Sequence, residues 1–263
     1  MPADRETVTD IIREAAETFI LPRFRHLEDS QVRSKDHAAD LVTVADEESE
    51  SFLSEALSKL LPDSLVVGEE ATAADPSVLS RLMSDKPVWV LDPVDGTHNF
   101  AHGKERFCVL VALVQRNETL AGWLHDPLTN TTYWAGRGEG AWDGDQALNV
   151  ATTKPIRDMT ASLSRRLAEK ILVLGREKTK EVVRYRCAGH EYRDLANGTL
   201  DFGRYGGQLK PWDHAAGTLL VREAGGRAAH VDGRDYVPLG APEGSMLVAP
   251  DETWETLNKH FCA

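Results

Sequence analysis

Residues 87–103, with the sequence PVWVLDPVDGTHNFAHG, predict a buried strand that ends in a pair of carboxylates. The apolar run before Asp92 is typical of a short buried strand, and Pro93 keeps Asp92 extended. Gly96 allows a sharp turn or a close approach to a ligand. The oxygens of Asp92 and Asp95 suit a hard divalent cation, and the free N–H groups of the turn suit an anion. Asp-Pro and Asp-Gly pairs are also common in ordinary surface turns, so the motif alone leaves both interpretations open.

The composition predicts a folded protein that works away from membranes. The chain has 263 residues, of which 41% are hydrophobic and 27% charged, as is usual for globular proteins. Its net charge of -12 weighs against nucleic acid or an anionic membrane as the main partner, because both require clustered Lys and Arg. No apolar run approaches the length of a membrane span, and the N-terminus has no apolar signal-peptide region. We therefore expect a cytoplasmic protein.

The three cysteines are Cys108, Cys187 and Cys262, which lie far apart in the sequence. They show no Cys-x-x-Cys spacing, so the sequence predicts neither a zinc site nor a disulfide framework. Cys108 belongs to the apolar run FCVLVALV and is expected in the core. A reduced setting agrees with a cytoplasmic protein.

The N-terminal part predicts two helices with a polar connection. Apolar residues in 4–21 recur at helical spacing, and Pro22 is expected to end or kink this helix. Residues 26–43 are too polar for the core and predict a loop or hairpin. Thr43 is a suitable N-cap for a second helix, with Asp46 in the first turn, where an acid favours the helix dipole. This structural role accounts for Asp46 without a catalytic one.

Residues 64–70, SLVVGEE, predict a short strand that stops at Gly68. The adjacent carboxylates of Glu69 and Glu70 repel each other unless a cation or solvent separates them. Taken alone, the segment is more typical of an exposed loop than of a metal site. It leads towards the central strand, so Glu69 and Asp92 can lie at the ends of neighbouring strands.

The remainder predicts a change of architecture near residue 150. Residues 106–150 alternate strand-like runs with turn signals, which indicates an antiparallel meander. The composition changes at residues 151–158, so we place one domain at 1–150 and another at 151–263. The second alternates strand and helix signals, as an α/β domain does. It includes a short helix at 214–224, a last strand and a last helix.

Four segments, in this order, resemble the inositol monophosphatase family of metal-dependent phosphatases: DLVTVADEESE (40–50), GEE (68–70), WVLDPVDGTHNF (89–100) and PWDHAAGTLLVREAGG (211–226). The resemblance extends from about residue 35 to residue 226. It implies a layered α/β/α/β/α sandwich, in which an N-terminal α+β domain with a largely antiparallel sheet precedes a smaller C-terminal α/β domain. It also implies a phosphoric monoester hydrolase with two or three Mg2+ ions per subunit, and homodimers are usual in the family.

The resemblance also implies roles for individual residues. The implied metal ligands are Glu69, Asp92, Asp95, Asp213 and the backbone carbonyl of Val94. Asp46 and Thr97 orient or deprotonate the attacking water, and Glu70 is a further catalytic candidate. Asp95 and the turn at Gly96 and Thr97 hold the phosphate. Lys35 and Asp36 fall on a mobile loop associated with a third, weaker metal, although both could equally be solvated charges.

The chemistry of such a site is coherent. Converging carboxylates repel one another without a cation, so metal binding stabilises the arrangement. The metals neutralise the phosphate and activate a bound water for in-line attack. No Cys or Ser nucleophile motif is present, so no covalent phospho-enzyme is expected.

The departures from the family pattern concern the substrate. Inositol-binding members carry a Glu shortly before their Trp-Asp pair, where this chain has Tyr205 or Gly206. His190 and Glu191 stand where the family has small pocket residues, and either is equally a core or surface residue. Inositol 1-phosphate is the default substrate, with histidinol phosphate or 3'-phosphoadenosine 5'-phosphate as alternatives. A regulatory protein associated with RNA polymerase or the ribosome is the alternative from another class.

Overall fold

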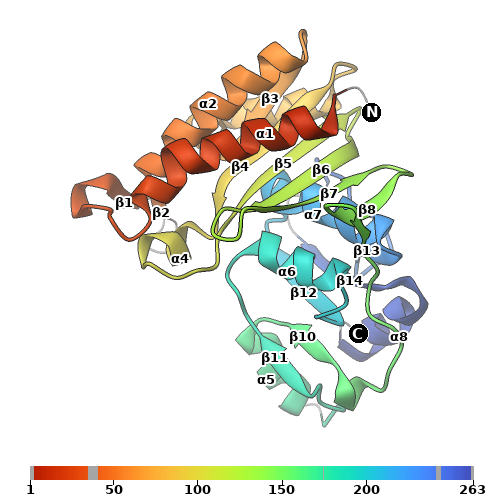
Figure 1. Ribbon diagram of the computed structural model, residues 1–263. Coiled ribbons are helices and arrows are strands. Elements are labelled where there is room, and N and C mark those ends of the chain that lie inside the picture. The colour runs from red at the N-terminus through yellow and green to blue at the C-terminus, as the bar shows by residue number, and fades with distance from the viewer. Residues whose placement is uncertain (1–2, 35–40, 174, 241–243, 262–263) are drawn as a thin grey trace.

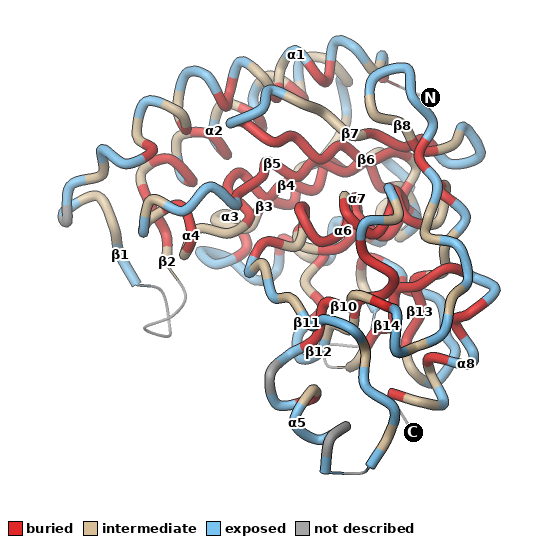
Figure 2. Tube along the Cα trace, turned by 60° about the horizontal axis from the view of Figure 1, so that its bottom comes forward, coloured by how far each residue is buried: buried red, intermediate tan, exposed pale blue. Residues whose placement is uncertain are grey.

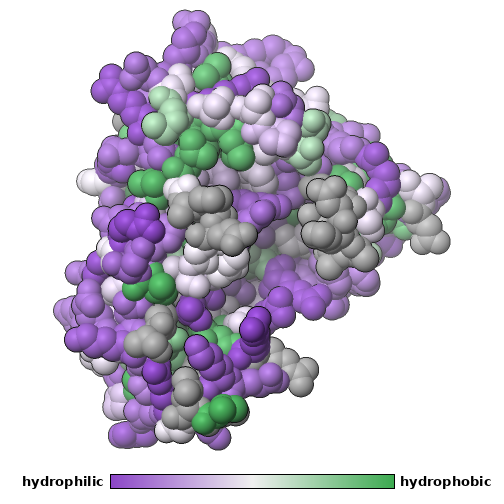
Figure 3. Space-filling model, turned by 180° about the vertical axis from the view of Figure 1, so that it is seen from behind, coloured by the Kyte–Doolittle hydropathy of each residue, from purple (hydrophilic) through white to green (hydrophobic). Residues whose placement is uncertain are grey.

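The computed structural model describes residues 3–34, 41–173, 175–240 and 244–261. Its elements form five layers in the order helix, sheet, helix, sheet, helix (Figure 1). This arrangement confirms the α/β/α/β/α sandwich. Within these ranges no helix is both long and apolar enough to cross a membrane. On the face seen in Figure 3, the surface is mostly hydrophilic and the hydrophobic side chains gather in small patches.

The first layer consists of two long helices, α1 and α2, which cover one face of the larger sheet (Figure 1). Helix α1 spans Arg5–Ala15 and is continued by a π-helical turn over Ala16–Ile20 and a 3-10 turn over Leu21–Arg23. Helix α2 spans Val44–Leu60. The first helical run ends one residue after Pro22, as predicted. Thr43 and Asp46 form a capping box at the start of α2, in which Asp46 Oδ2 accepts the backbone N–H of Thr43 at 2.8 Å and its hydroxyl at 2.5 Å.

The second layer is a seven-stranded sheet in the order β3-β4-β5-β6-β7-β8-β9. Its strands are β3 (Leu65–Gly68), β4 (Val88–Asp95), β5 (Cys108–Gln115), β6 (Glu118–Asp126), β7 (Thr131–Gly136), β8 (Gly140–Asp143) and β9 (Gln146–Ala147). β3 and β4 are parallel and the other neighbours antiparallel, which confirms the meander. Both faces of β4 are covered: Trp89 packs in the core under α1 and α2, whereas Val90 packs in the core between the sheets.

The middle layer consists of α6 (Ala188–Ala196) and α7 (Pro211–Glu223), which lie between the two sheets. Figure 2 shows both helices in the most buried part of the molecule. α7 begins three residues before the predicted start at 214. Proline is favoured in the first turn because its missing N–H would have no partner there.

The fourth layer is a mixed sheet in the order β11-β10-β12-β14-β13. Its strands are β10 (Thr160–Ser162), β11 (Glu181–Val183), β12 (Phe202–Gly207), β13 (Gly226–His230) and β14 (Gly244–Pro250). β10 is parallel to β11 and β12, whereas β14 is antiparallel to β12 and β13. Helices α5 (Arg165–Val173) and α8 (Asp251–Phe261) form the fifth layer, where Leu167 and Trp254 share one core cluster with Phe202.

The remaining elements are short. They are β1 (Val32–Ser34) and β2 (Leu41–Thr43), which pair antiparallel, α3 (Glu69–Ala74), α4 (Thr97–Ala101), and 3-10 turns at Asp29–Gln31, Pro76–Met83 and Ile156–Asp158. The predicted boundary at residues 151–158 falls between the last strand of the larger sheet and the first of the smaller one. Because α7 packs on the larger sheet, the division into domains 1–150 and 151–263 stays a prediction.

Candidate active site

The end of β4 positions the motif DPVDG. The sequence predicts that the strand ends at Asp92. In the structure β4 instead continues to Asp95, with an irregular register between the two aspartates. Gly96 then adopts a left-handed conformation with φ of 87°. A Cβ at this position would lie 2.8 Å from the carbonyl oxygen of Arg106, so only glycine fits the turn. Thr97 follows as the first residue of α4.

The predicted metal ligands come together at this strand end. We call them the acidic cluster: Glu69 at the start of α3, Asp92 and Asp95 on β4, and Asp213 in the first turn of α7. Burial raises the pKa of Asp92, and the negative charges of Glu69, Asp95 and Asp213 raise it further. Burial, Glu69 and Asp95 likewise raise the pKa of Asp213. Carboxylates that destabilise one another in this way, and that offer only hard oxygen donors, fit a divalent cation such as Mg2+.

Asp46 and Thr97 form a hydrogen-bonded pair beside the acidic cluster. The Thr97 hydroxyl donates to Asp46 Oδ1 at 3.1 Å and to the carbonyl of Val94 at 2.9 Å. Burial raises the pKa of Asp46 to about 7, with smaller contributions from the charges of Glu70 and Glu69. Asp46 therefore both caps α2 and faces the candidate site. A carboxylate that titrates near neutral pH is suited to accept a proton from water.

Glu50 fixes the backbone at the start of α3, beside the site, and the sequence analysis does not predict this role. Its two carboxylate oxygens accept the backbone N–H groups of Glu70 and Ala71, each at 2.8 Å, and so hold the first turn of α3 in place. Glu50 follows Asp46 by four residues on α2 and so lies on the same helix face. That spacing is the one signal in the sequence that points to it.

Asp95 is held by the start of α6. Its Oδ1 accepts the N–H of Ala188 at 3.0 Å, and its Oδ2 accepts the N–H of Gly189 at 2.5 Å and the thiol of Cys187 at 3.2 Å. Burial raises the pKa of Asp95, although these hydrogen bonds oppose the shift. No sequence signal predicts this contact, because its partners are more than ninety positions apart in the chain.

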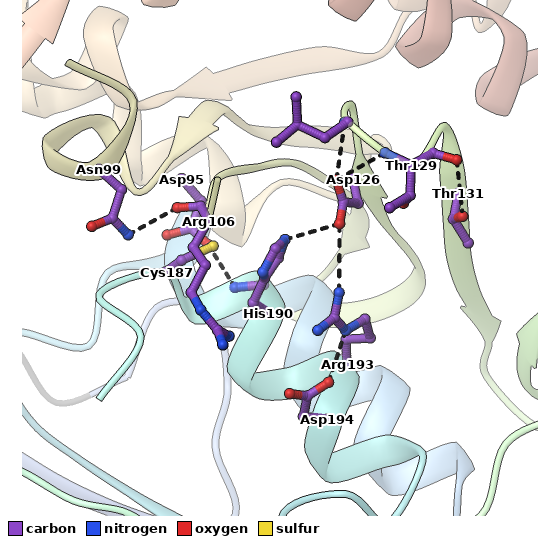
Figure 4. Close-up of polar contacts among 12 residues, drawn as sticks. Asp95, Asn99, Arg106, Asp126, Thr129, Thr131, Cys187, His190, Arg193 and Asp194 are labelled. Atoms are coloured by element: carbon purple, nitrogen blue, oxygen red, sulfur yellow. Dashed lines mark hydrogen bonds and ion pairs between the residues drawn. The ribbon is translucent and has the colours of Figure 1, made fainter. Parts of the chain in front are cut away.

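The two predicted substrate contacts in the C-terminal half lie in packed surroundings. His190, on α6, is buried, and its Nε2 lies 3.2 Å from Asp126 Oδ2 (Figure 4). The ring of Tyr205, on β12, stacks on Tyr192 with 5.1 Å between the centroids. Their roles towards substrate stay predictions. Lys35 and Asp36 lie outside the described residues.

A basic cavity of about 380 Å³ opens beside the Gly96 turn. It is lined by Asn99, Lys104, Glu105, Arg106, Arg184, Tyr185 and Arg186. The Asn99 amide donates to the carbonyls of Arg106 and Tyr185 at 2.8 and 2.9 Å, which joins the two loops that form the cavity. The Arg106 guanidinium lies 3.7 Å from the centre of the Tyr185 ring. In a chain with a net charge of -12, this gathering of basic side chains favours an anionic group of the ligand.

Comparison with known proteins supports the resemblance. The model of the inositol monophosphatase family matches residues 4–263. The chain is 35% identical over 204 residues to the inositol-1-monophosphatase of Rhizobium meliloti (strain 1021), which covers 74% of each chain. It is 32% identical over 231 residues to the Nus factor SuhB of Haemophilus influenzae (strain ATCC 51907), which covers 84% of this chain and 82% of the relative.

A solved structure confirms the fold. The Thermotoga maritima IMPase superposes with a TM-score of 0.83 at 22% sequence identity and covers 97% of this chain and 95% of its own. The family acts on small phosphorylated substrates and depends on metal ions. Because the family model matches nearly the whole chain, the protein belongs to the inositol monophosphatase family and is a phosphoric monoester hydrolase.

Proposed function

We propose that the protein is a Mg2+-dependent phosphomonoesterase whose principal substrate is inositol 1-phosphate. The observation that carries this proposal is the acidic cluster beside the turn at Gly96. Buried carboxylates that raise one another's pKa need a neighbouring cation to remain ionised, and their oxygens match the preference of Mg2+. The substrate is supported by the relative from Rhizobium meliloti, which is named inositol-1-monophosphatase.

In this proposal the chain's own groups bind metal and phosphate and move one proton. The acidic cluster and the carbonyl of Val94 would hold two Mg2+ ions. Lys35 and Asp36, which the resemblance associates with a third ion, lie outside the described residues. When bound, the ions neutralise the phosphate and lower the pKa of a coordinated water. The N–H groups of Gly96 and Thr97 hold the phosphate. Asp46 accepts the proton of the attacking water, and Thr97 orients that water.

A second candidate substrate class follows from the basic cavity. Its four cationic side chains, Lys104, Arg106, Arg184 and Arg186, face one acid, Glu105. The cavity adjoins the proposed phosphate position, since a Cβ on Gly96 would contact the carbonyl of Arg186 at 3.2 Å. A substrate with a second phosphate, such as 3'-phosphoadenosine 5'-phosphate, places that group among these cations. Its one carboxylate, Glu105, is paired with Arg25, so the lining favours such a phosphate over the ammonium group of histidinol phosphate.

The two substrates are separated by steady-state kinetics of phosphate release with Mg2+ present. We expect Arg186→Gln to lower kcat/KM for 3'-phosphoadenosine 5'-phosphate about tenfold, as expected for one charged hydrogen bond. It should leave kcat/KM for inositol 1-phosphate within about twofold. Arg166→Gln, an exposed position on α5, is the matched control. An equal loss of kcat/KM for both substrates would show that the cavity does not select the substrate. If the wild-type protein released phosphate from neither compound, the assignment of substrate would be overturned.

Three further expectations belong to the proposal. A homodimer is tested by size-exclusion chromatography with light scattering, and a cytoplasmic setting is tested by fractionation of the source cells.

The relative named Nus factor SuhB supports a second, regulatory role through protein partners. The net charge of -12 weighs against direct binding of nucleic acid. Co-purification of RNA polymerase or ribosomal protein with a tagged Asp213→Asn variant would show a role independent of hydrolysis.

A further inference from the structure

Two thiols and one imidazole meet behind the candidate active site. Cys108 begins β5, Cys187 immediately precedes α6, and His190 lies on the first turn of α6. One sulfur or ring nitrogen from each side chain lies within 4.8 Å of the other two. All three residues are buried, with at most 4% of their surface exposed. We call this set the thiol–imidazole cluster.

The separations in the cluster are close to those of a tetrahedral metal site. Zinc lies about 2.3 Å from cysteine sulfur and about 2.0–2.1 Å from histidine nitrogen, so ligands in a tetrahedral site are about 3.5–3.8 Å apart. The largest separation here is at most 4.8 Å. A contraction of about 1 Å would therefore bring all three atoms to one ion. Two sulfur ligands and an imidazole prefer a thiophilic ion such as Zn2+ over Mg2+.

A carboxylate already supports the imidazole from outside the cluster. His190 Nε2 faces Asp126 Oδ2 at 3.2 Å (Figure 4), and the same ring is hydrogen-bonded to Cys108. The other oxygen of Asp126 accepts the N–H of Leu128 at 3.0 Å, which fixes the carboxylate. In metal sites, a histidine ligand usually gives its second ring nitrogen to such a carboxylate, which orients the ring and strengthens the ligand. This outer contact distinguishes the cluster from cysteines that merely fill a core.

We infer that Cys108, Cys187 and His190 form a second metal site, which binds one thiophilic divalent ion of the Zn2+ class. On binding, both thiols lose their protons to solvent, as does the His190 ring nitrogen that binds the ion if it carries one. The ligands are then two thiolates and a neutral imidazole. The site differs from the acidic cluster, whose donors are all oxygen. The two are neighbours, because the Cys187 thiol donates to Asp95 Oδ2 at 3.2 Å.

The link through Cys187 gives the second site a consequence for hydrolysis, and this part rests on the proposed function. A metal-bound thiolate has no proton to donate to Asp95, so that carboxylate loses one of the three hydrogen bonds that it accepts. The two thiolates cancel the charge of the bound ion, so the second site adds no net positive charge beside Asp95. The carboxylate oxygen that lost its hydrogen bond is then a stronger donor to a cation in the acidic cluster. We expect one equivalent of Zn2+ to lower the Mg2+ concentration required for half-maximal turnover several-fold.

Binding is measured directly on the wild-type protein. We expect one equivalent of Cd2+ to produce the ultraviolet charge-transfer band of cadmium thiolate, and X-ray absorption of the Zn2+-loaded protein to show two sulfur neighbours. Only oxygen and nitrogen around zinc would overturn the inference, as would the absence of a thiolate band from folded protein. These measurements need no variant, and they do not depend on phosphatase activity.

Variants assign the ligands. Cys108→Ser should abolish the cadmium band, and Asp126→Asn should weaken Zn2+ binding about 10- to 100-fold, the usual effect of losing an outer-shell carboxylate. Cys262→Ser is the matched thiol control, and Asp213→Asn removes a donor of the acidic cluster only. Both should keep the band. A band that persists in folded Cys108→Ser, or that disappears in Asp213→Asn, would contradict the assignment.

Discussion

Asp95 Oδ2 accepts the backbone N–H of Gly189 at 2.5 Å and thereby joins the end of β4 to the first turn of α6. This contact ties the larger sheet to the helix layer that separates it from the smaller one. The carboxylate at the centre of the candidate site is therefore also a cap for α6. A carboxylate at a helix N-terminus satisfies N–H groups that have no partner within the helix.

Replacement of Asp95 by asparagine should remove activity. The amide keeps the size of the side chain but loses the charge, so we expect kcat to fall at least about 100-fold and Mg2+ affinity to weaken. Phosphate release and calorimetric titration with Mg2+ measure the two effects. Asp145→Asn, an exposed position in the β8–β9 turn, is the control. Turnover equal to that of the parent protein would exclude Asp95 from the reaction.

Thr97 tests the position of the attacking water. Thr97→Ala removes the hydroxyl that bridges Asp46 and the carbonyl of Val94, so kcat should fall about 100-fold while Mg2+ affinity and folding are preserved. Thr97→Ser keeps a hydroxyl and should recover most of the rate. If the serine and alanine variants were equally slow, the hydroxyl would have no part in positioning water.

Gly68 provides a structural test of the shell around the site. A Cβ on Gly68 would lie 2.3 Å from Glu50 Cδ, so Gly68→Ala must displace the carboxylate that holds the first turn of α3. We expect a loss of about 1–3 kcal/mol in the free energy of unfolding, measured with urea, and weaker Mg2+ binding. Gly206→Ala is the matched control, because its nearest neighbour would lie at 3.5 Å. Equal stability of the two variants would refute this packing argument.

His125 should make stability depend on pH. Burial lowers the pKa of His125 to about 4, with a smaller effect from Arg13. The unfolded chain therefore takes up this proton near pH 6.5 and the folded protein does not, so stability is lost as pH falls from about 6.5 to about 4. This residue contributes roughly 3 kcal/mol to that loss. Urea unfolding of His125→Gln at pH 7 and pH 5 should show a smaller difference than the parent, and an unchanged difference would exclude His125.

The sequence predicts the architecture well because its signals are local. Helical spacing, the Thr43 cap and the turn residues each act over a few positions, and they give the helices, the meander and the motif at the end of β4. The extension of β4 to Asp95 is missed because the apolar run that indicates the strand ends at Leu91 and is followed by residues typical of turns. The irregular register after Asp92 accommodates Pro93, since proline is tolerated at a bulge.

The sequence predicts only those parts of the site in which the type of side chain indicates its chemical role. The carboxylates are found because four motifs occur in the family order, and the structure brings the four acids of the acidic cluster together. Backbone donors such as the N–H of Gly189 carry no side-chain signal, and their positions depend on the packing of α6. The same holds for Cys108 and Cys187, whose spacing in sequence hides their contact.

Phosphate release by the wild-type protein, with Mg2+ and after its removal by EDTA, tests the central claim most directly. The panel contains inositol 1-phosphate, histidinol phosphate, 3'-phosphoadenosine 5'-phosphate, fructose 1,6-bisphosphate and glycerol 2-phosphate. The account predicts release that requires Mg2+, returns when Mg2+ is restored, and favours inositol 1-phosphate. Phosphate release that continues at full rate in EDTA would contradict it. So would the absence of phosphate release from every compound when the protein is folded and loaded with Mg2+.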